Sequence, residues 1–167
     1  MNITIIADAS FCPDEHVAGY GFWIASQRGK LGGGGKCIDG GRVDSSTAAE
    51  MMAVCDSIHQ AIEARLVQPQ DSVLVQTDCM AAIQAFQGLR TNLPVQERNA
   101  VKYMQQLTKE LALTFMFKHV KGHSGILDAR SITNKLCDER AKKAMRIARN
   151  VSKARKLKQT FIEGNAV

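Results

Sequence analysis

Apolar residues recur along the chain with two different periods, which predict alternating strands and helices. Four segments are typical of strands, at residues 1–8, 17–26, 73–77 and 113–120. A further strand is weakly indicated near 36–38, after a glycine run at 32–35 that we interpret as a loose hairpin connection. Four segments are typical of helices. The first follows a start signal at 44–47 and continues to about Leu66, and the others are at 79–87, 96–111 and 129–150. The resulting order, β-β-β-α-β-α-α-β-α, indicates an α/β domain.

The positive charge of the chain is concentrated near its C-terminus. The net charge is +6, and the segment from Arg140 to Lys158 holds nine of the 22 basic residues and no acidic one. Such a segment suits a polyanion such as nucleic acid, although a solvated helix face followed by a loose tail would have the same composition. We therefore expect one domain at 1–150 and a basic C-terminal tail at 151–167.

Composition also limits where the protein can act. No apolar run reaches the roughly 18 residues that a membrane span requires, so we expect no membrane partner. The five cysteines form no C-x-x-C pair, and an odd number cannot all pair within one chain. Reduced thiols in an intracellular compartment are the simpler interpretation, and we expect a cytoplasmic monomer.

Two acidic residues close apolar runs that predict buried strands. Asp8 ends the first run and Asp78 follows the run at 73–77. A carboxylate in such a position is costly to desolvate unless a cation or a hydrogen-bond donor compensates its charge. Because open α/β sheets form their binding crevices at strand ends, Asp8 and Asp78 indicate one charged site.

Two more acids can join this site, and each has a simpler interpretation. Glu50 lies at the margin of an apolar helix stripe and can point into a cleft, but its spacing from Thr47 also fits a capping box. Asp138 can be an ordinary helix acid that pairs with Lys142. A carboxylate cluster without His or Cys ligands favours Mg²⁺ or Mn²⁺ over zinc. Two such ions about 4 Å apart can activate a water and stabilise the leaving oxygen of a phosphodiester.

Two histidines differ in their expected roles. His123 lies in a glycine-flanked loop, where its imidazole can transfer protons or remain an exposed loop side chain. His119 continues the face formed by Phe115 and Phe117, and we interpret it as structural.

An ordered set of motifs resembles the type 1 ribonuclease H family over roughly residues 1–148. The motifs are Asp8-Ala9-Ser10, Gly19-Tyr20-Gly21, Ala49-Glu50-Met51-Met52-Ala53, Thr77-Asp78, Val120-Lys121-Gly122-His123-Ser124-Gly125 and Cys137-Asp138-Glu139-Arg140-Ala141. The resemblance implies a five-stranded mixed sheet of order 3-2-1-4-5, flanked by helices. It also implies cleavage of the RNA strand of an RNA–DNA hybrid.

The same resemblance implies a role for each matching residue. Asp8, Glu50, Asp78 and Asp138 would hold two Mg²⁺ or Mn²⁺ ions when substrate is bound, with His123 assisting catalysis. We expect substrate contacts from Ser10, Ser46, Thr47 and Lys121. Apart from the resemblance, our hypothesis is that Lys121 and the basic segment from Arg140 to Lys158 contact phosphates.

The chain departs from the family where the hybrid is recognised. Many members carry two asparagines at the positions of Ser46 and Thr47, whose side chains have a shorter reach. The Trp- and Lys-rich helical handle of some bacterial members is also absent, and the basic C-terminal segment can substitute for it. Because discrimination of RNA from DNA depends on contacts to the 2′-hydroxyl, two alternatives stay open. One is a structure-selective DNA endonuclease for branched or junction DNA, and the other is a non-catalytic nucleic-acid-binding module.

Overall fold

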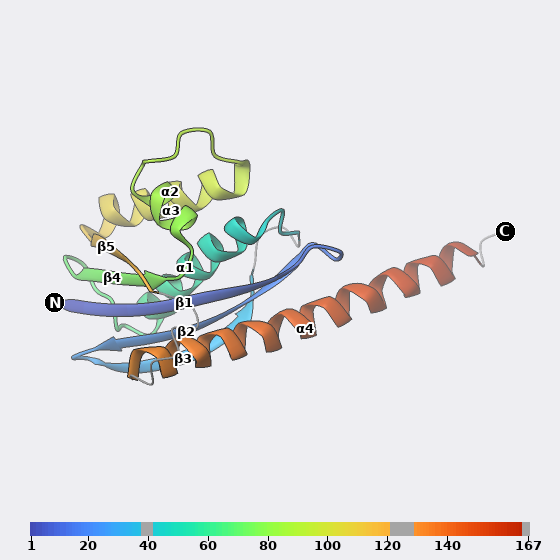
Figure 1. The fold of residues 1–167 in the computed structure, drawn as a ribbon, viewed down its shortest axis with the longest axis horizontal. Coiled ribbons are helices and arrows are strands. Elements are labelled where there is room, and N and C mark those ends of the chain that lie inside the picture. The colour runs from blue at the N-terminus through green and yellow to red at the C-terminus, as the bar shows by residue number, and fades with distance from the viewer. Residues whose placement is uncertain (38–41, 121–128, 165–167) are drawn as a thin grey trace.

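The computed structural model describes residues 1–37, 42–120 and 129–164, and within them the chain forms one five-stranded sheet with helices on both faces (Figure 1). In chain order the elements are β1 (Asn2–Cys12), β2 (Val17–Ser26), β3 (Gly29–Lys36), α1 (Ser46–Glu63), β4 (Ser72–Thr77), α2 (Met80–Phe86), α3 (Val95–Leu111), β5 (Thr114–His119) and α4 (Ala129–Gly164). The strand order is β3-β2-β1-β4-β5, so the expected α/β fold and its sheet order are confirmed.

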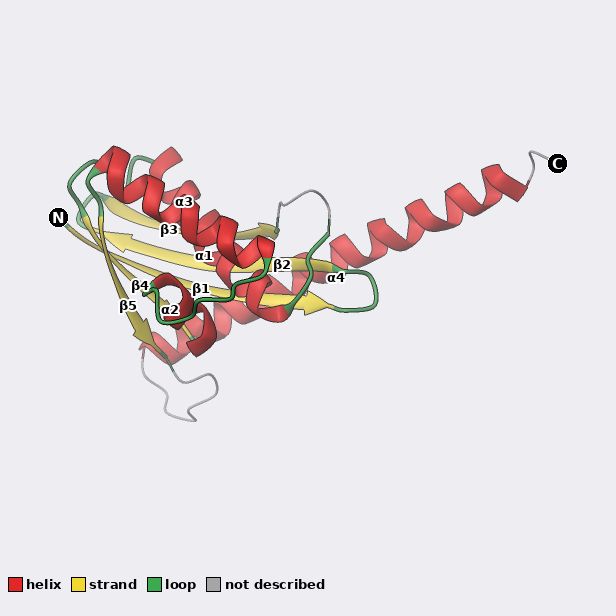
Figure 2. Ribbon diagram, turned by 90° about the horizontal axis from the view of Figure 1, so that it is seen from above, coloured by secondary structure: helices red, strands yellow, loops and turns green. Residues whose placement is uncertain are grey.

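The sheet is mixed, and its central strand β1 joins two different halves. On one side β1, β2 and β3 are antiparallel neighbours, whereas on the other side β1, β4 and β5 run parallel. The helices α1, α2 and α3 cover one face, and α4 crosses the other face and extends beyond the sheet (Figures 1 and 2). No helix in these residues has the length and apolarity needed to cross a membrane.

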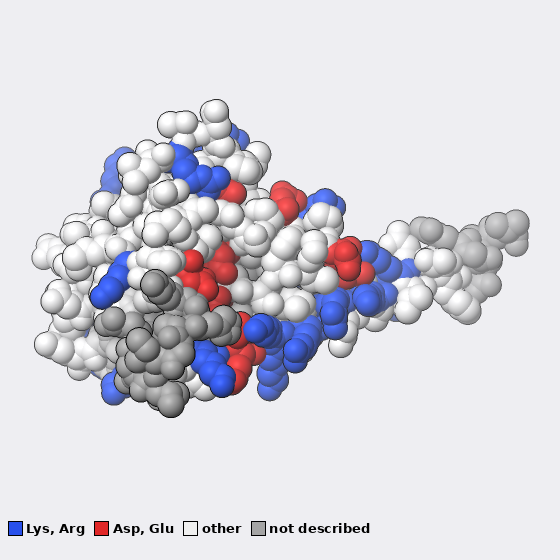
Figure 3. Space-filling view, in the orientation of Figure 1, with Lys and Arg blue, Asp and Glu red and all other residues white. Residues whose placement is uncertain are grey.

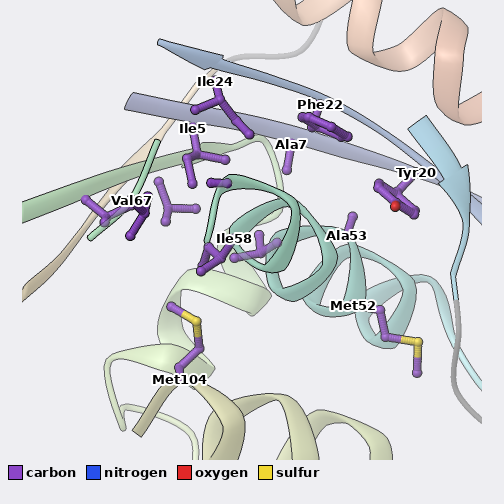
Figure 4. Close-up of a cluster of buried hydrophobic side chains, with 14 of the residues drawn as sticks. Ile5, Ala7, Tyr20, Phe22, Ile24, Met52, Ala53, Ile58, Val67 and Met104 are labelled. Atoms are coloured by element: carbon purple, nitrogen blue, oxygen red, sulfur yellow. The ribbon is translucent and has the colours of Figure 1, made fainter. Parts of the chain in front are cut away.

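The main core lies between the sheet and α1. Alternate side chains of β1, including Ile5 and Ala7, meet the buried face of α1 at Ala53 and Ile58 (Figure 4). Because strand side chains alternate between the two faces, the intervening residues Ile6 and Asp8 face the side that α4 covers. Both layers of helices therefore pack directly against β1.

The glycine run is part of a strand, so its interpretation as a hairpin connection was wrong. Residues 32–35 lie inside β3, which pairs along its length with β2, and the connection is the turn before Gly29. Glycine weakens a strand unless another backbone must approach closely. That approach is evident on the paired strand β2, where a Cβ on Gly21 would lie 2.0 Å from the carbonyl oxygen of Cys137. A Cβ on Gly19 would lie 2.3 Å from the backbone nitrogen of Met145.

The last helix is longer than the sequence predicted. It does not end at Asn150 but continues to Gly164, so the described part of the expected tail is a helix that projects from the body (Figure 1). Between Ala129 and Glu163 there is neither glycine nor proline, and Lys, Arg, Ala and Leu, which favour helices, predominate. One asparagine is too weak a signal to end such a helix. The division into a domain at 1–150 and a separate tail stays a prediction.

Candidate active site

The register of the two central parallel strands places two acids side by side. β1 and β4 pair from Asn2 with Ser72 to Ile6 with Gln76. Continuing this register by two residues places Asp8 beside Asp78, which directly follows β4. The sequence indicated both residues. Only the assembled sheet shows that each lies two positions beyond the last β1–β4 pair, Ile6 with Gln76.

Asp8 does not end its strand, as the sequence suggested, but lies inside it. β1 continues to Cys12 because β2 remains paired with it, and Asp8 lies opposite Gly21. β4 has already ended at Thr77. Asp8 therefore has β2 on one side but no strand on the β4 side. Side chains from the two faces of the sheet can meet in this opening.

Glu50 reaches this opening from α1, on the other face of the sheet. The helix is capped by Ser45, whose hydroxyl accepts a hydrogen bond of 3.0 Å from the backbone N–H of Ala48. The capping box between Thr47 and Glu50, which was the simpler alternative for Glu50, does not form, since Thr47 lies inside the first turn. One carboxylate oxygen of Glu50, Oε2, is buried and has no hydrogen-bond partner. Such an orphaned oxygen is what a bound cation would satisfy.

The structure brings three of the four expected acids into one cluster. Within the described residues, one carboxylate oxygen from each of Asp8, Glu50 and Asp78 lies within 4.8 Å of the others. Acidic side chains are visible in the middle of the face drawn in Figure 3, with basic side chains beside them. This set of hard oxygen donors fits Mg²⁺ or Mn²⁺.

The fourth acid lies beside the cluster but is occupied by another partner. Asp138 projects from α4, and its Oδ2 accepts a hydrogen bond of 2.7 Å from Nζ of Lys142. This is the helical ion pair that the sequence left open as the simpler interpretation. The charge of Asp138 nevertheless contributes to a raised pKa at Asp8, so the two side chains are close.

Burial and mutual repulsion make the cluster retain protons. Burial, together with the charges of Asp78 and Asp138, raises the pKa of Asp8 to about 7. Burial, with the charges of Asp8 and Asp78, raises the pKa of Glu50 to about 9. The backbone N–H of Ala9 opposes both shifts by hydrogen bonding to the carboxylates. Without a cation, the folded state therefore either holds these protons at neutral pH or is strained by repulsion among the carboxylates.

We expect this strain to appear as a falling stability with rising pH in the absence of divalent ions. The unfolded carboxyls of Asp8 and Glu50 lose their protons near pH 4, whereas the folded ones retain them up to about pH 7 and 9. The folded state thus binds more protons in this interval, and the free energy of unfolding contributed by these groups decreases as pH rises.

Thermal unfolding of the parent and of Glu50→Gln in EDTA, at pH 5.5 and 8.5, measures this effect. At pH 8.5 the variant should have the higher midpoint, by at least about 3 °C, which corresponds to 1 kcal/mol in a domain of this size. At pH 5.5 the difference should shrink, and Mg²⁺ should raise the midpoint of the parent more at pH 8.5. A parent that is more stable than the variant at pH 8.5 would contradict this account.

The remaining expected residues lie near the clustered acids along β1 and α1, or outside the described residues. Ser10 follows Asp8 by two positions in β1, so it lies on the same face, half-buried. Ser46 is exposed and Thr47 half-buried in the first turn of α1, one turn before Glu50. His123 and Lys121 lie outside the described residues.

His119, which the sequence analysis interpreted as structural, has a contact with the site that the sequence did not predict. His119 is exposed rather than part of the apolar face, and its Nε2 donates to the backbone carbonyl of Asp78 at 3.0 Å. The contact forms because β5 pairs in parallel with β4, with His119 opposite Thr77. His119 therefore helps to position the backbone that carries Asp78. Its place at the end of the strand adjacent to β4 was the signal available in the sequence.

Comparison with known families places this arrangement among established proteins. A family model described as RNase H matches residues 1–146. The chain belongs to the RNase H family. This membership confirms the resemblance found in the sequence and makes the protein a ribonuclease H-type hydrolase. No curated protein sequence matches the chain.

Solved RNase H structures share the fold at low sequence identity. RNase H1 from the archaeon Halobacterium salinarum superposes with a TM-score of 0.65 at 16% identity, covering 86% of this chain and 97% of that one. The N-terminal RNase H domain of a Mycobacterium tuberculosis protein gives a TM-score of 0.61 at 16% identity, covering 90% and 98%. LC11-RNase H1, solved in complex with an RNA/DNA hybrid, gives 0.60 at 18% identity, covering 87% and 98%.

Proposed function

We propose that the protein is a divalent-metal-dependent endonuclease that hydrolyses the RNA strand of RNA–DNA hybrids. The observation that carries the proposal is the cluster of Asp8, Glu50 and Asp78 at the open edge of the sheet in a chain of the RNase H family. A surface that merely bound nucleic acid would gain nothing from clustered carboxylates, because they repel phosphates. The similarity in fold to LC11-RNase H1, which binds an RNA/DNA hybrid, supports the substrate class.

The residues fit a site for Mg²⁺ or Mn²⁺, with two ions when substrate is bound. Asp8, Glu50 and Asp78 would hold them, and Asp138 would join by exchanging its ion pair with Lys142 for a cation. When bound, such ions supply a Lewis acid for the phosphate and lower the pKa of a coordinated water. Glu50 has a buried oxygen without a protein partner, which supports this role.

The chain's own residues would then bind and orient the substrate. Ser10, two positions after Asp8 in β1, and Ser46 and Thr47, about one turn before Glu50 in α1, would hydrogen bond to sugar or phosphate groups. Asp8 and Glu50 would release the protons that their raised pKa values retain, so ligand binding and deprotonation are coupled. Roles for Lys121 in contacting phosphate and for His123 in proton transfer or product release complete the proposal.

A matched set of substrates tests the assignment. A labelled RNA–DNA hybrid, a DNA duplex and a four-way DNA junction of the same sequence are incubated with the protein in Mg²⁺, and an Asp8→Asn preparation controls for contaminating nuclease. We expect cleavage of the RNA strand of the hybrid, leaving a 3′-hydroxyl and a 5′-phosphate. Preferential cutting of the junction would instead support the DNA endonuclease, which the short side chains of Ser46 and Thr47 favour.

We further propose that the protein acts as a monomer in the cytoplasm. All five cysteines are free thiols, and Cys12, Cys37 and Cys137 are buried, which suits a reducing compartment.

A further inference from the structure

The basic residues of α4 lie on different sides of the helix and have different contacts. Nη1 of Arg140 donates to the backbone carbonyl of Phe22 at 3.0 Å, so this guanidinium is used in packing α4 against the sheet. Lys143 and Arg155 line a groove of about 570 Å³ between α4 and the segment Gly33–Lys36 of β3. The floor of this groove includes glycine backbone and the side chains of Ile147 and Val151.

A second group of basic residues forms a row on a different side of α4. The row consists of Lys142, Arg146, Arg149, Lys153 and Lys156. Their spacings of four, three, four and three residues place them on one continuous helix face. Asp138 precedes Lys142 by four residues, so the face that carries this acid continues directly into the row. In Figure 3, basic side chains extend along α4 from the acidic side chains at the centre of the face.

Contacts at both ends establish where the row lies. At its beginning, Lys142 pairs with Asp138, and its charge also acts on Asp8. At its end, Nζ of Lys156 lies 2.8 Å from Oε2 of Glu15, which follows the end of β1. The hydroxyl of Ser152 donates to the same carboxylate oxygen at 2.8 Å. The row thus runs from the candidate active site to the far end of the β1–β2 hairpin.

In the middle of the row, no acidic side chain of the described residues forms an ion pair with Arg146, whereas the charge of Lys153 helps to lower the pKa of Glu15. Arg146 and Lys153 are exposed, and the segment from Arg140 to Lys158 contains no acid. A helix rises about 1.5 Å per residue, so the row extends about 27 Å beyond Asp138 to Lys156. This length corresponds to about 8 base pairs of a duplex at a rise of about 3.4 Å.

We infer that this row is a phosphate-binding track that holds the duplex on one side of the cleavage site. The inference rests on the proposed function, since the track begins at the cluster where the scissile phosphate would lie. An acidic protein is a poorer occupant, because a regular row of cations that continues the active-site face matches the periodic phosphates of a nucleic-acid duplex. The track extends the substrate footprint well beyond the acids.

Two double variants with the same change in charge test the track. Arg146→Gln/Lys153→Gln removes two charges from the row, and Lys143→Gln/Arg155→Gln removes two from the groove side of the same helix. Binding of a 24-base-pair hybrid and a 24-base-pair DNA duplex is measured in EDTA at several salt concentrations. Circular dichroism verifies that each variant is folded.

The row variant should bind the hybrid about tenfold more weakly, and the slope of log affinity against log salt should decrease by about 2. In Mg²⁺ it should raise KM and leave kcat unchanged, because the track acts on binding and not on the chemical step. The groove variant should remain within about twofold of the parent. The single variants R146Q and K153Q should each give about half of the change in slope.

If both double variants bind the hybrid equally more weakly, net charge alone would explain the effect, and the proposed track would be overturned. Unchanged binding by the row variant would also overturn it. Failure of the proposed function is distinguishable, because binding in EDTA does not require cleavage. If the protein does not cut hybrids but the track is correct, the row variant still binds the DNA duplex more weakly than the groove variant.

Discussion

Replacing Asp78 with asparagine is expected to reduce metal-dependent cleavage by at least about a thousandfold while leaving the protein folded. The substitution keeps the size of the side chain but removes one of three clustered negative charges. Asp78 is exposed and follows the end of β4, so no core packing depends on it. The loss should therefore appear in catalysis and cation binding, and the substitution should not destabilise the fold.

Initial rates on a labelled hybrid, in Mg²⁺ and in Mn²⁺, measure the effect of Asp78→Asn, and thermal unfolding verifies the fold. Glu63→Gln is a matched control, because it removes one negative charge from the far end of α1, thirteen residues from Glu50. The control should retain activity within about twofold of the parent. Near-normal turnover by Asp78→Asn would reject the assignment of the site.

Replacing Gly21 with alanine is expected to destabilise the protein by at least about 3 kcal/mol. The new Cβ would lie 2.0 Å from the carbonyl oxygen of Cys137, which is backbone and cannot rotate away. α4 must then move off the sheet, and Asp138, the next residue, moves with it. Since Gly21 is the residue paired with Asp8, activity should decrease together with stability.

Gly35→Ala is the control for this substitution. Its Cβ would meet the ring of Tyr20 at 3.1 Å, and a ring can shift by a few tenths of an ångström. Its cost should be about 1 kcal/mol or less. Urea denaturation of both variants, followed by circular dichroism, gives the two free energies of unfolding. If the two variants prove equally stable, α4 does not depend on the close approach at Gly21.

Several elements were predictable because their signals are local. The runs at 17–26 and 73–77 match β2 and β4 within one residue, since their apolar residues are buried in the sheet and bounded by turn residues. The spacing of Met51, Val54 and Ile58 predicted α1, and all three are buried. Asp8 and Asp78 were recognisable as site candidates because acids beside buried strands need compensation.

Other features could not be predicted because they depend on residues elsewhere in the chain. Glycines 32–35 suggest a turn by local propensity, yet they form β3 on the sheet that α4 crosses. The ends of α4 and β1 depend on what continues to pair or pack with them, so neither Asn150 nor Asp8 is a boundary. The cap of α1 at Ser45 required the backbone geometry to distinguish it from two similar neighbours.

The sequence by itself determined which side chains are available to the site, and in what order along the chain. It also determined that a basic segment follows Asp138, because composition and spacing are properties of the chain alone. Only the tertiary structure decided that Asp8 and Asp78 lie side by side, that Glu50 reaches them through the open edge, and that α4 brings Asp138 close to Asp8. These contacts depend on strand register and on helix packing across a sheet, which join residues that are distant in sequence.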